Sequence, residues 1–103
     1  MNSEILFEIN TPLNVTVRTT KEYWNYLISI KHQVMQNREE TVKRVLSEPV
    51  SVRKSRIDEN VFLYYRQEDK LYCVVVRHEG MDGYLITAYP TDKVKEGDLV
   101  WTK

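Results

Sequence analysis

The stretch from Val61 to Tyr89 constrains the fold most strongly, because short runs of apolar, β-branched and aromatic residues alternate there with polar gaps. The runs are Val61–Gln67, Leu71–Arg77 and Gly83–Tyr89. Each run has the length of an ordinary β-strand, and the gaps are short enough for hairpin turns. The pattern therefore predicts an antiparallel meander, which the rest of the chain must cover or extend.

Alternating apolar and polar residues also predict strands before the meander. Glu4–Ile9 and Leu13–Thr19 show this period of two on either side of a turn, which is typical of an N-terminal hairpin. Val50–Ser55 alternates as well. We expect it to form a fourth strand that enters the meander through the turn Ile57–Asn60.

Two segments have the spacing of amphipathic helices. Thr19 stands three residues before Glu22, which is the reciprocal capping pattern of a helix start, and we expect a helix over Thr20–His32. Asn37 repeats the capping signal before a second helix over Arg38–Ser47. The residues expected to be buried are Tyr23, Leu27, Ile30 and Val34 in the first helix and Val42, Val45 and Leu46 in the second.

The segment after the meander lacks a regular pattern. We expect Pro90 to end the sheet and Thr91–Lys103 to be mostly irregular, with Leu99–Trp101 adding a short strand or covering an edge of the core. The elements together predict an α+β fold, with two N-terminal helices packed on a four-stranded antiparallel sheet and an N-terminal β-hairpin. The 103 residues, of which 42% are apolar, suit a single domain over residues 1–103.

Composition narrows the function classes. The 15 basic and 15 acidic residues balance, so the net charge does not favour binding to nucleic acid or to a membrane. With one cysteine, two histidines and three scattered glycines, we expect neither a metal site nor a phosphate-binding loop, and hence no cofactor. The apolar setting of Cys73 fits a reducing cytoplasm, and we expect no secretory signal and no membrane-spanning segment.

A local excess of positive charge lies between Lys43 and Arg56, although the whole chain is neutral. Arg53 and Ser55 stand two positions apart on a predicted strand, so their side chains should share one face. A guanidinium and a hydroxyl placed in this way could bind a phosphate. The same charges are also typical of a solvated edge strand, and both interpretations stay open.

His32 is a candidate for proton transfer, because an imidazole titrates near neutral pH and the end of the predicted helix lies near the surface. Thr87 and Tyr89 should share one face of the last strand, where a hydroxyl and a phenol could donate to a phosphate. Each residue also has a structural explanation, since a helical histidine often caps or packs, and Thr and Tyr favour strands. His78 is expected to be a solvated turn residue.

The order of several motifs resembles a known superfamily. The chain carries Lys31-His32 on a predicted helix, followed by Val-Arg-Lys-Ser-Arg-Ile-Asp, Val-Phe-Leu-Tyr-Tyr, Cys-Val-Val-Val and Leu-Ile-Thr-Ala-Tyr-Pro-Thr-Asp. Over about Thr16–Gly97 this order is similar to small phage and bacterial members, in particular cyanobacterial-type members, of the barnase, EndoU, colicin and RelE-like nuclease superfamily.

The resemblance implies a metal-independent ribonuclease site on the open face of the sheet, where a ribose 2′-hydroxyl attacks the adjacent phosphorus. His32 would be the acid or base, Arg53 the phosphate clamp and Ser55 an auxiliary donor. Thr87 and Tyr89 would be donors on the final strand. The weaker candidates are Arg38 and Tyr65.

We therefore predict an endoribonuclease-like domain, as in the toxin of a toxin–antitoxin pair, with RNA as substrate and an antitoxin or another protein as partner. The alternative is a catalytically inactive module of the same fold that binds protein or RNA. A self-associating domain without a ligand is a third interpretation, since exposed meander edges pair readily. The sequence leaves the oligomeric state open.

Overall fold

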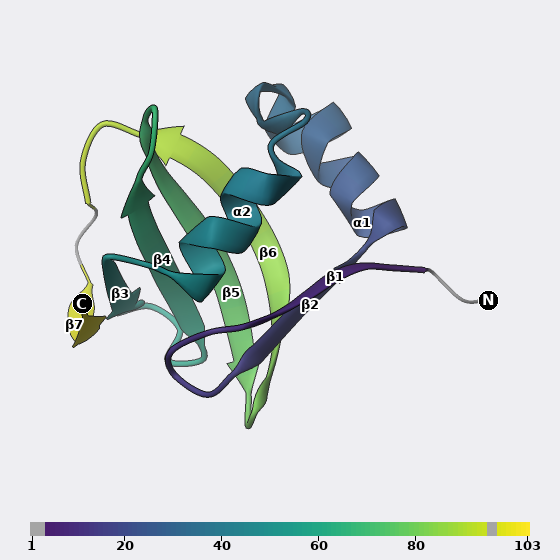
Figure 1. The fold of residues 1–103 in the computed structure, drawn as a ribbon. Helices are drawn as coiled ribbons and strands as arrows, with labels where there is room; N and C mark the ends of the chain where they lie inside the picture. Colours follow the sequence, from purple (N-terminus) through teal and green to yellow (C-terminus); the bar gives the residue numbers. More distant parts are fainter. Residues whose placement is uncertain (1–3, 95–96) are drawn as a thin grey trace.

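The computed structural model describes residues 4–94 and 97–103, so Lys95 and Glu96 of the predicted irregular tail lie outside the described residues. The fold is built on one seven-stranded sheet, with the strands in the order β1-β2-β6-β5-β4-β3-β7 (Figure 1). In chain order the strands are β1 (Ile5–Asn10), β2 (Thr16–Thr20), β3 (Ser51–Lys54), β4 (Val61–Gln67), β5 (Leu71–Glu79), β6 (Asp82–Thr91) and β7 (Asp98–Thr102).

The predicted meander is confirmed, because β4 pairs with β5 and β5 pairs with β6, both antiparallel. The expectation that Pro90 ends the sheet is wrong, since β6 continues through it and Pro90 lies opposite Tyr72. β2 pairs with β6 only from Asp82 to Tyr84, so Pro90 stands where β6 is an edge strand. A proline is tolerated at an edge, where its missing amide removes no ladder hydrogen bond.

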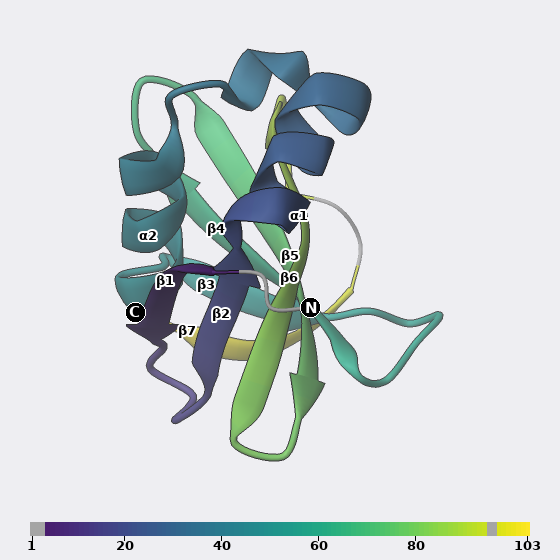
Figure 2. The same cartoon turned by 90° about the vertical axis from the view of Figure 1, so that its right-hand side faces the viewer.

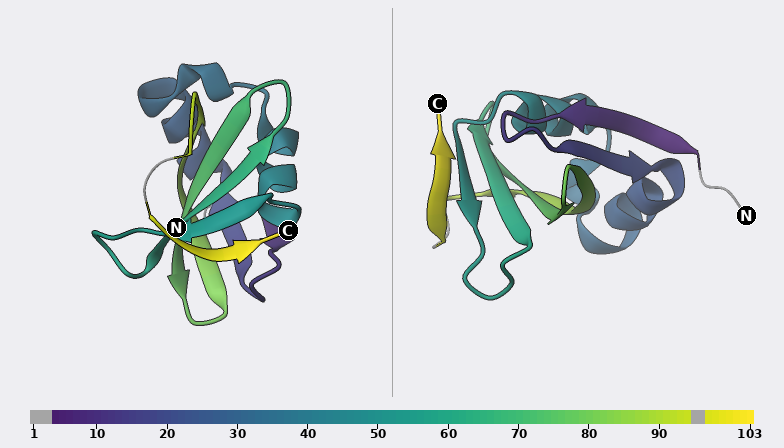
Figure 3. Two further views of the ribbon diagram at one scale, coloured as in Figure 1. Left: turned by 90° about the vertical axis from the view of Figure 1, so that its left-hand side faces the viewer. Right: turned by 90° about the horizontal axis from the view of Figure 1, so that it is seen from below.

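The prediction of a four-stranded antiparallel sheet with a separate N-terminal hairpin is wrong. The antiparallel pair β1–β2 exists, but β2 joins the sheet by running parallel to β6. The C-terminal strand β7 then extends the other side by pairing with β3, which confirms only that residues 99–101 add a short strand. The result is a mixed sheet, with β1 and β7 at its two edges (Figure 3, right).

The helical segments are shorter than predicted. They are α1 (Lys21–Tyr26), a π-helical segment η1 (Leu27–Lys31), a short 3₁₀ turn η2 (Gln33–Met35) and α2 (Glu39–Ser47). Thr20 rather than Thr19 caps α1, because its hydroxyl accepts from the Tyr23 amide at 3.0 Å. Asn37 does not cap α2 either, since its φ of 64° places it in a left-handed turn before that helix.

Both helices pack on one face of the sheet and build the main core there (Figures 1 and 2). Trp24, Leu27 and Met35 are buried in it, as are the predicted α2 residues. The predicted burial of Ile30 and Val34 is wrong, because they are 69% and 52% exposed. The π segment has more residues per turn than an α-helix, so residues within it and after it face another direction than α-helical spacing predicts.

The other face of the sheet points away from the two helices, and we call it the distal face (Figure 3, left). A smaller apolar cluster around the buried Tyr65, Cys73 and Val75 lies on it. Its cross-strand rows are Arg53, Leu63, Val75 and Thr87, then Ser51, Tyr65, Cys73 and Tyr89, then Gln67, Leu71 and Thr91. The helices in the described part of the chain are too short or too polar to span a bilayer.

Candidate functional site

The π segment determines where His32 lies. The His32 amide donates to the Leu27 carbonyl at 2.8 Å, a hydrogen bond across five residues that closes the π turn. The imidazole then packs against the ring of Tyr89, with the ring centroids 5.4 Å apart and the planes at 42°. The structure therefore brings these two predicted site residues, which come from separate elements, into direct contact.

The surroundings of His32 favour its neutral form. Burial lowers the pKa of the imidazole, and the positive charge of the neighbouring Lys31 lowers it further. A histidine whose pKa lies below its ordinary value is largely unprotonated at pH 7. His32 can accordingly accept a proton from a group placed beside it.

The surroundings of Tyr89 have the opposite effect. Burial raises the pKa of its phenol. The charge of Cys73, a side-chain hydrogen bond between Tyr89 and Cys73, and the charge of Tyr65 raise it further. The phenol stays protonated at neutral pH and can donate a hydrogen bond. A potential base and a potential donor thus come from two rings in contact.

Thr87 lies on the same face of β6 as Tyr89, as predicted. Two residues along a strand correspond to about 7 Å, so the two side chains are neighbours. The Thr87 hydroxyl oxygen is buried and has no hydrogen-bond partner among the described residues. A buried hydroxyl without a partner is destabilising, and the Thr87 hydroxyl keeps its hydrogen-bonding capacity for a bound group.

Arg53 also lies on the distal face, but it is separated from β6 by β4 and β5. At about 4.8 Å between neighbouring strands, three spacings place the backbones of β3 and β6 about 14 Å apart. The guanidinium points toward the β7 side, where Nη1 donates to the Gly97 carbonyl at 3.0 Å. Arg53 Nε is buried without a hydrogen-bond partner in the described part of the chain. Arg53 and Tyr89 therefore do not converge on one anion-sized hollow.

Ser55 does not join the site. It follows the end of β3, and its hydroxyl oxygen accepts from the amides of Ile57 and Asp58 at 3.1 and 3.3 Å. Such bonds stabilise the turn between β3 and β4. The expectation that Ser55 continues the strand beside Arg53 is thus wrong.

The two weaker candidates also have structural roles. Arg38 forms an ion pair with Asp69 at 3.4 Å, and this contact joins the start of α2 to the β4–β5 loop. Tyr65 is 1% exposed and belongs to the apolar cluster of the distal face.

The basic residues between Lys43 and Arg56 do not form one patch. Lys43 pairs with Glu40 at 3.0 Å, and Arg44 pairs with Glu68 at 2.8 Å. These two cations lie on α2, on the opposite side of the sheet from Arg53. The local charge excess in the sequence is thereby divided between two faces of the molecule.

Sequence reasoning missed the setting of His78. It lies within β5 rather than in a turn, stacked on Phe62 with the ring centroids 3.9 Å apart. Its Nε2 lies 2.9 Å from the Tyr64 hydroxyl, which in turn donates to Thr11 Oγ1 at 3.2 Å. Burial lowers the pKa of His78 to about 4. Its position two residues after Val76, and hence on the same face of a continued strand, was the available signal.

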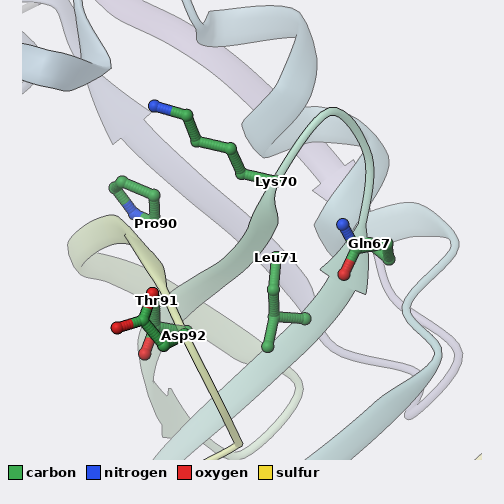
Figure 4. Close-up of a pocket in the computed structure, with 6 residues that line it drawn as sticks. All are labelled: Gln67, Lys70, Leu71, Pro90, Thr91 and Asp92. Atoms are coloured by element: carbon green, nitrogen blue, oxygen red, sulfur yellow. The ribbon is translucent and has the colours of Figure 1, made fainter.

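A hollow of about 740 Å³ lies next to the row of Tyr89, between the β4–β5 loop and the end of β6 (Figure 4). We call it the end hollow. Thr91, two residues after Tyr89, belongs to its wall. The lining residues are Gln67, Lys70, Leu71, Pro90, Thr91 and Asp92.

Within residues 4–94 and 97–103, no group of three or more histidine, cysteine, aspartate and glutamate side chains is placed to hold a metal ion. Comparison with known proteins found no match to the chain among family models, curated proteins or solved structures. The nuclease resemblance stays a prediction, and the contact between His32 and Tyr89 is the strongest feature from which a function can be argued.

Proposed function

We propose that this protein is an endoribonuclease that cleaves single-stranded RNA at the His32–Tyr89 contact on the distal face. The observation that supports this proposal most directly is the 5.4 Å contact between the two rings, one favoured as neutral imidazole and the other as protonated phenol. Tyr89 lies two residues before Thr91 of the end hollow and two residues after Thr87, whose buried hydroxyl has no hydrogen-bond partner in the described part of the chain.

The proposed reaction needs a base, a proton donor and no redox partner. His32 accepts the proton of a ribose 2′-hydroxyl while the 2′-oxygen attacks the adjacent phosphorus. The bond from phosphorus to the 5′-oxygen breaks, and Tyr89 gives its proton to this strongly basic leaving group. The imidazolium returns a proton to the phenolate, so both residues are restored, and the products are a 2′,3′-cyclic phosphate and a 5′-hydroxyl.

Arg53 has a different task in this proposal from the one expected of it. Because it lies about 14 Å from β6, it would bind another phosphate of the same strand rather than the reacting one. A guanidinium is suited to this, since it contacts phosphate oxygens with two parallel hydrogen bonds. Its bond to the Gly97 carbonyl uses Nη1 and leaves other donors for a ligand.

A second candidate is a binding module without catalysis. It is favoured by the separation of Arg53 from His32, since a cleaving enzyme usually places a cation at the reacting phosphate. In this case RNA or a protein partner would occupy the distal face without reaction. Cleavage assays separate the two candidates directly.

The test is cleavage of a fluorescent single-stranded RNA by the purified wild type and by His32→Ala and Tyr89→Phe. General acid–base groups contribute about 100-fold to 10,000-fold in rate, so we expect each variant to lose at least about 100-fold. The matched control is Tyr84→Phe, because Tyr84 is an exposed tyrosine on the same strand. It should cleave like the wild type.

The identity of the product provides a further check, since the reaction predicts a 2′,3′-cyclic phosphate. Expression in a bacterial host should slow growth for the wild type and not for His32→Ala. Equal cleavage by the wild type and both site variants, or none by any of them, would contradict the proposal. Binding of RNA without cleavage would then favour the second candidate.

A further inference from the structure

We infer that the end hollow is a nucleobase subsite that prefers adenine, cytosine or guanine, which carry an exocyclic amino group, over uracil. This inference rests on the proposed function, because the function supplies the RNA strand. The hollow is not used by the cleavage chemistry, and its size and lining indicate what it could hold. Its volume of about 740 Å³ falls within the range of small-molecule sites in proteins.

The wall of the end hollow offers an apolar surface for a flat ring. Leu71 lines it from β5 on the distal face, and Pro90 lines it from β6 at the position opposite Tyr72. Both are only partly exposed (Figure 4). Proteins that hold single bases commonly place them against aromatic or apolar side chains. A base is therefore a better match for this wall than a phosphate, which needs donors around it.

Three residues of the end hollow offer acceptors, namely Gln67, Thr91 and Asp92, whereas the donors of its lining belong to Lys70 and Gln67. The Thr91 hydroxyl donates its proton to the Lys93 carbonyl at 3.1 Å, which leaves its lone pairs available. Gln67 uses one N–H toward the Glu68 carbonyl at 3.4 Å, and its side-chain oxygen remains an acceptor. The carboxylate of Asp92 is an acceptor only. A ligand that contacts these three acceptors must donate to them, and an exocyclic amino group supplies two donors.

Uracil matches the rim less well, because its edge presents two carbonyl acceptors around a single N–H. The carbonyls of uracil would lie against the acceptors of Asp92 and Thr91. The one cation of the lining, Lys70, extends along the rim beside Pro90 in Figure 4. Among the described residues no carboxylate is paired with it, so its ammonium can contact the phosphate of a bound nucleotide.

The position of the end hollow fits a base next to the reacting phosphate. Thr91 follows Tyr89 by two residues in β6, and Leu71 precedes Cys73 by two residues in the antiparallel β5. Both lie on the same face, one step of about 7 Å away. A nucleotide with its phosphate at the His32–Tyr89 contact could therefore reach the hollow with its own base. The end hollow would in this way select which bond is cleaved.

The test is titration of the wild type with the 5′-monophosphates of adenosine, cytidine, guanosine and uridine, followed by two-dimensional NMR. We expect the largest shifts at the Gln67 side-chain amide and the Thr91 and Asp92 backbone amides. Affinity for the uridine nucleotide should be about tenfold lower, since a hydrogen bond to a charged group is worth about that factor. Asp92→Asn should remove most of this difference.

The matched control is Glu59→Gln, which neutralises an exposed carboxylate in the β3–β4 loop, away from the end hollow. It should keep the base preference of the wild type. Equal affinity for the four nucleotides, or shifts confined to residues outside the hollow, would overturn the inference. If the wild type cleaves RNA and His32→Ala does not, the proposed function stands, whether or not the four nucleotides bind equally. If binding is base-selective but no RNA is cleaved, the subsite stands and the cleavage proposal is refuted.

Discussion

At the scale of single residues, His78 shows how strongly burial changes the pKa of a side chain. The ring is stacked on Phe62 and hydrogen-bonded to Tyr64, and burial lowers its pKa to about 4 from an ordinary value of 6.5. Because the unfolded chain binds a proton below pH 6.5 and the folded chain does so only near pH 4, protonation favours unfolding between these values. The stability contributed by neutral His78 is therefore complete above pH 6.5 and is lost as the pH falls to about 4.

We predict that the free energy of unfolding falls by about 1 to 2 kcal/mol more in the wild type than in His78→Gln between pH 7.5 and pH 4. This figure discounts the full pKa shift, because the ring is only partly buried. Glutamine keeps a polar group beside the Tyr64 hydroxyl and does not titrate. Urea unfolding at several pH values measures the difference, and the carboxylates contribute equally to both proteins. An equal decrease in the two proteins would show that His78 titrates normally.

The burial of a side chain could be predicted from the sequence where it depends on neighbours within the same helix. It could not be predicted where it depends on an irregular turn. Val42, Val45 and Leu46 are buried as the helical spacing of α2 predicts. Ile30 and Val34 are exposed, because the pattern assumes α-helical geometry and cannot reveal the π turn at residues 27–31. The same π turn places His32 against Tyr89. The feature that made the predicted burial of Ile30 and Val34 wrong therefore also positions the candidate base.

At the scale of elements, the part of β6 after Tyr84 has β5 on one side and, among the described residues, no strand on the other. β2 pairs with β6 only as far as Tyr84, and Ile86 forms a bulge without an opposite residue in β5. The Tyr23 hydroxyl of α1 donates to the Ile86 carbonyl at 2.6 Å. The first helix therefore replaces a strand at this edge and carries His32 toward the distal face.

We predict that Tyr23→Phe lowers the free energy of unfolding by about 1 kcal/mol, because it removes this hydrogen bond and leaves the Ile86 carbonyl unsatisfied. Tyr26→Phe is the matched control, since Tyr26 is a 47% exposed tyrosine on the same helix. An exposed substitution of this kind usually changes stability by less than about 0.5 kcal/mol. Chemical denaturation measures both variants, and equal losses would mean that the hydroxyl does not anchor α1.

Whole strands and helices were predicted correctly where the segment itself shows the apolar run of a strand or the helical spacing of apolar residues. The strand over Val61–Gln67 matches β4 at both ends, and the second helix begins one residue after the predicted start. The two other meander strands are longer than predicted, since β5 continues to Glu79 and β6 to Thr91. Cross-strand pairing extends them, and pairing depends on the neighbouring strand rather than on the residue itself.

At the scale of the whole molecule, two non-local pairings turn a meander into a mixed sheet. The β2–β6 pair joins residues 16–18 to residues 82–84, and the β3–β7 pair joins the middle of the chain to its C-terminal segment. No local sequence pattern predicts either pairing, because the contacting residues are far apart in sequence. The candidate site has the same origin. The resemblance implied one site that contains His32, Arg53 and Tyr89, and the fold brings His32 into contact with Tyr89 but leaves Arg53 apart.

The parallel junction between β2 and β6 depends on Gly83. A Cβ atom at this position would lie 2.9 Å from Val15 Cγ1 and 3.1 Å from Val17 Cγ2 and Val76 Cγ1. These methyl groups belong to the packed core, which has little room to move. Gly83 therefore permits the close approach by which the N-terminal hairpin attaches to the meander.

We predict that Gly83→Ala lowers the free energy of unfolding by about 1 to 3 kcal/mol, as overpacking of a core does. Amides of β2 should also exchange faster with solvent than those of β4, because the added methyl group separates the hairpin first. The control is Gly80→Asn, since Gly80 has a φ of +65° and open space around its Cα, and asparagine tolerates that conformation. Denaturation and hydrogen exchange of both variants test this. A loss for Gly83→Ala no larger than that for Gly80→Asn would mean that the β2–β6 junction can widen freely.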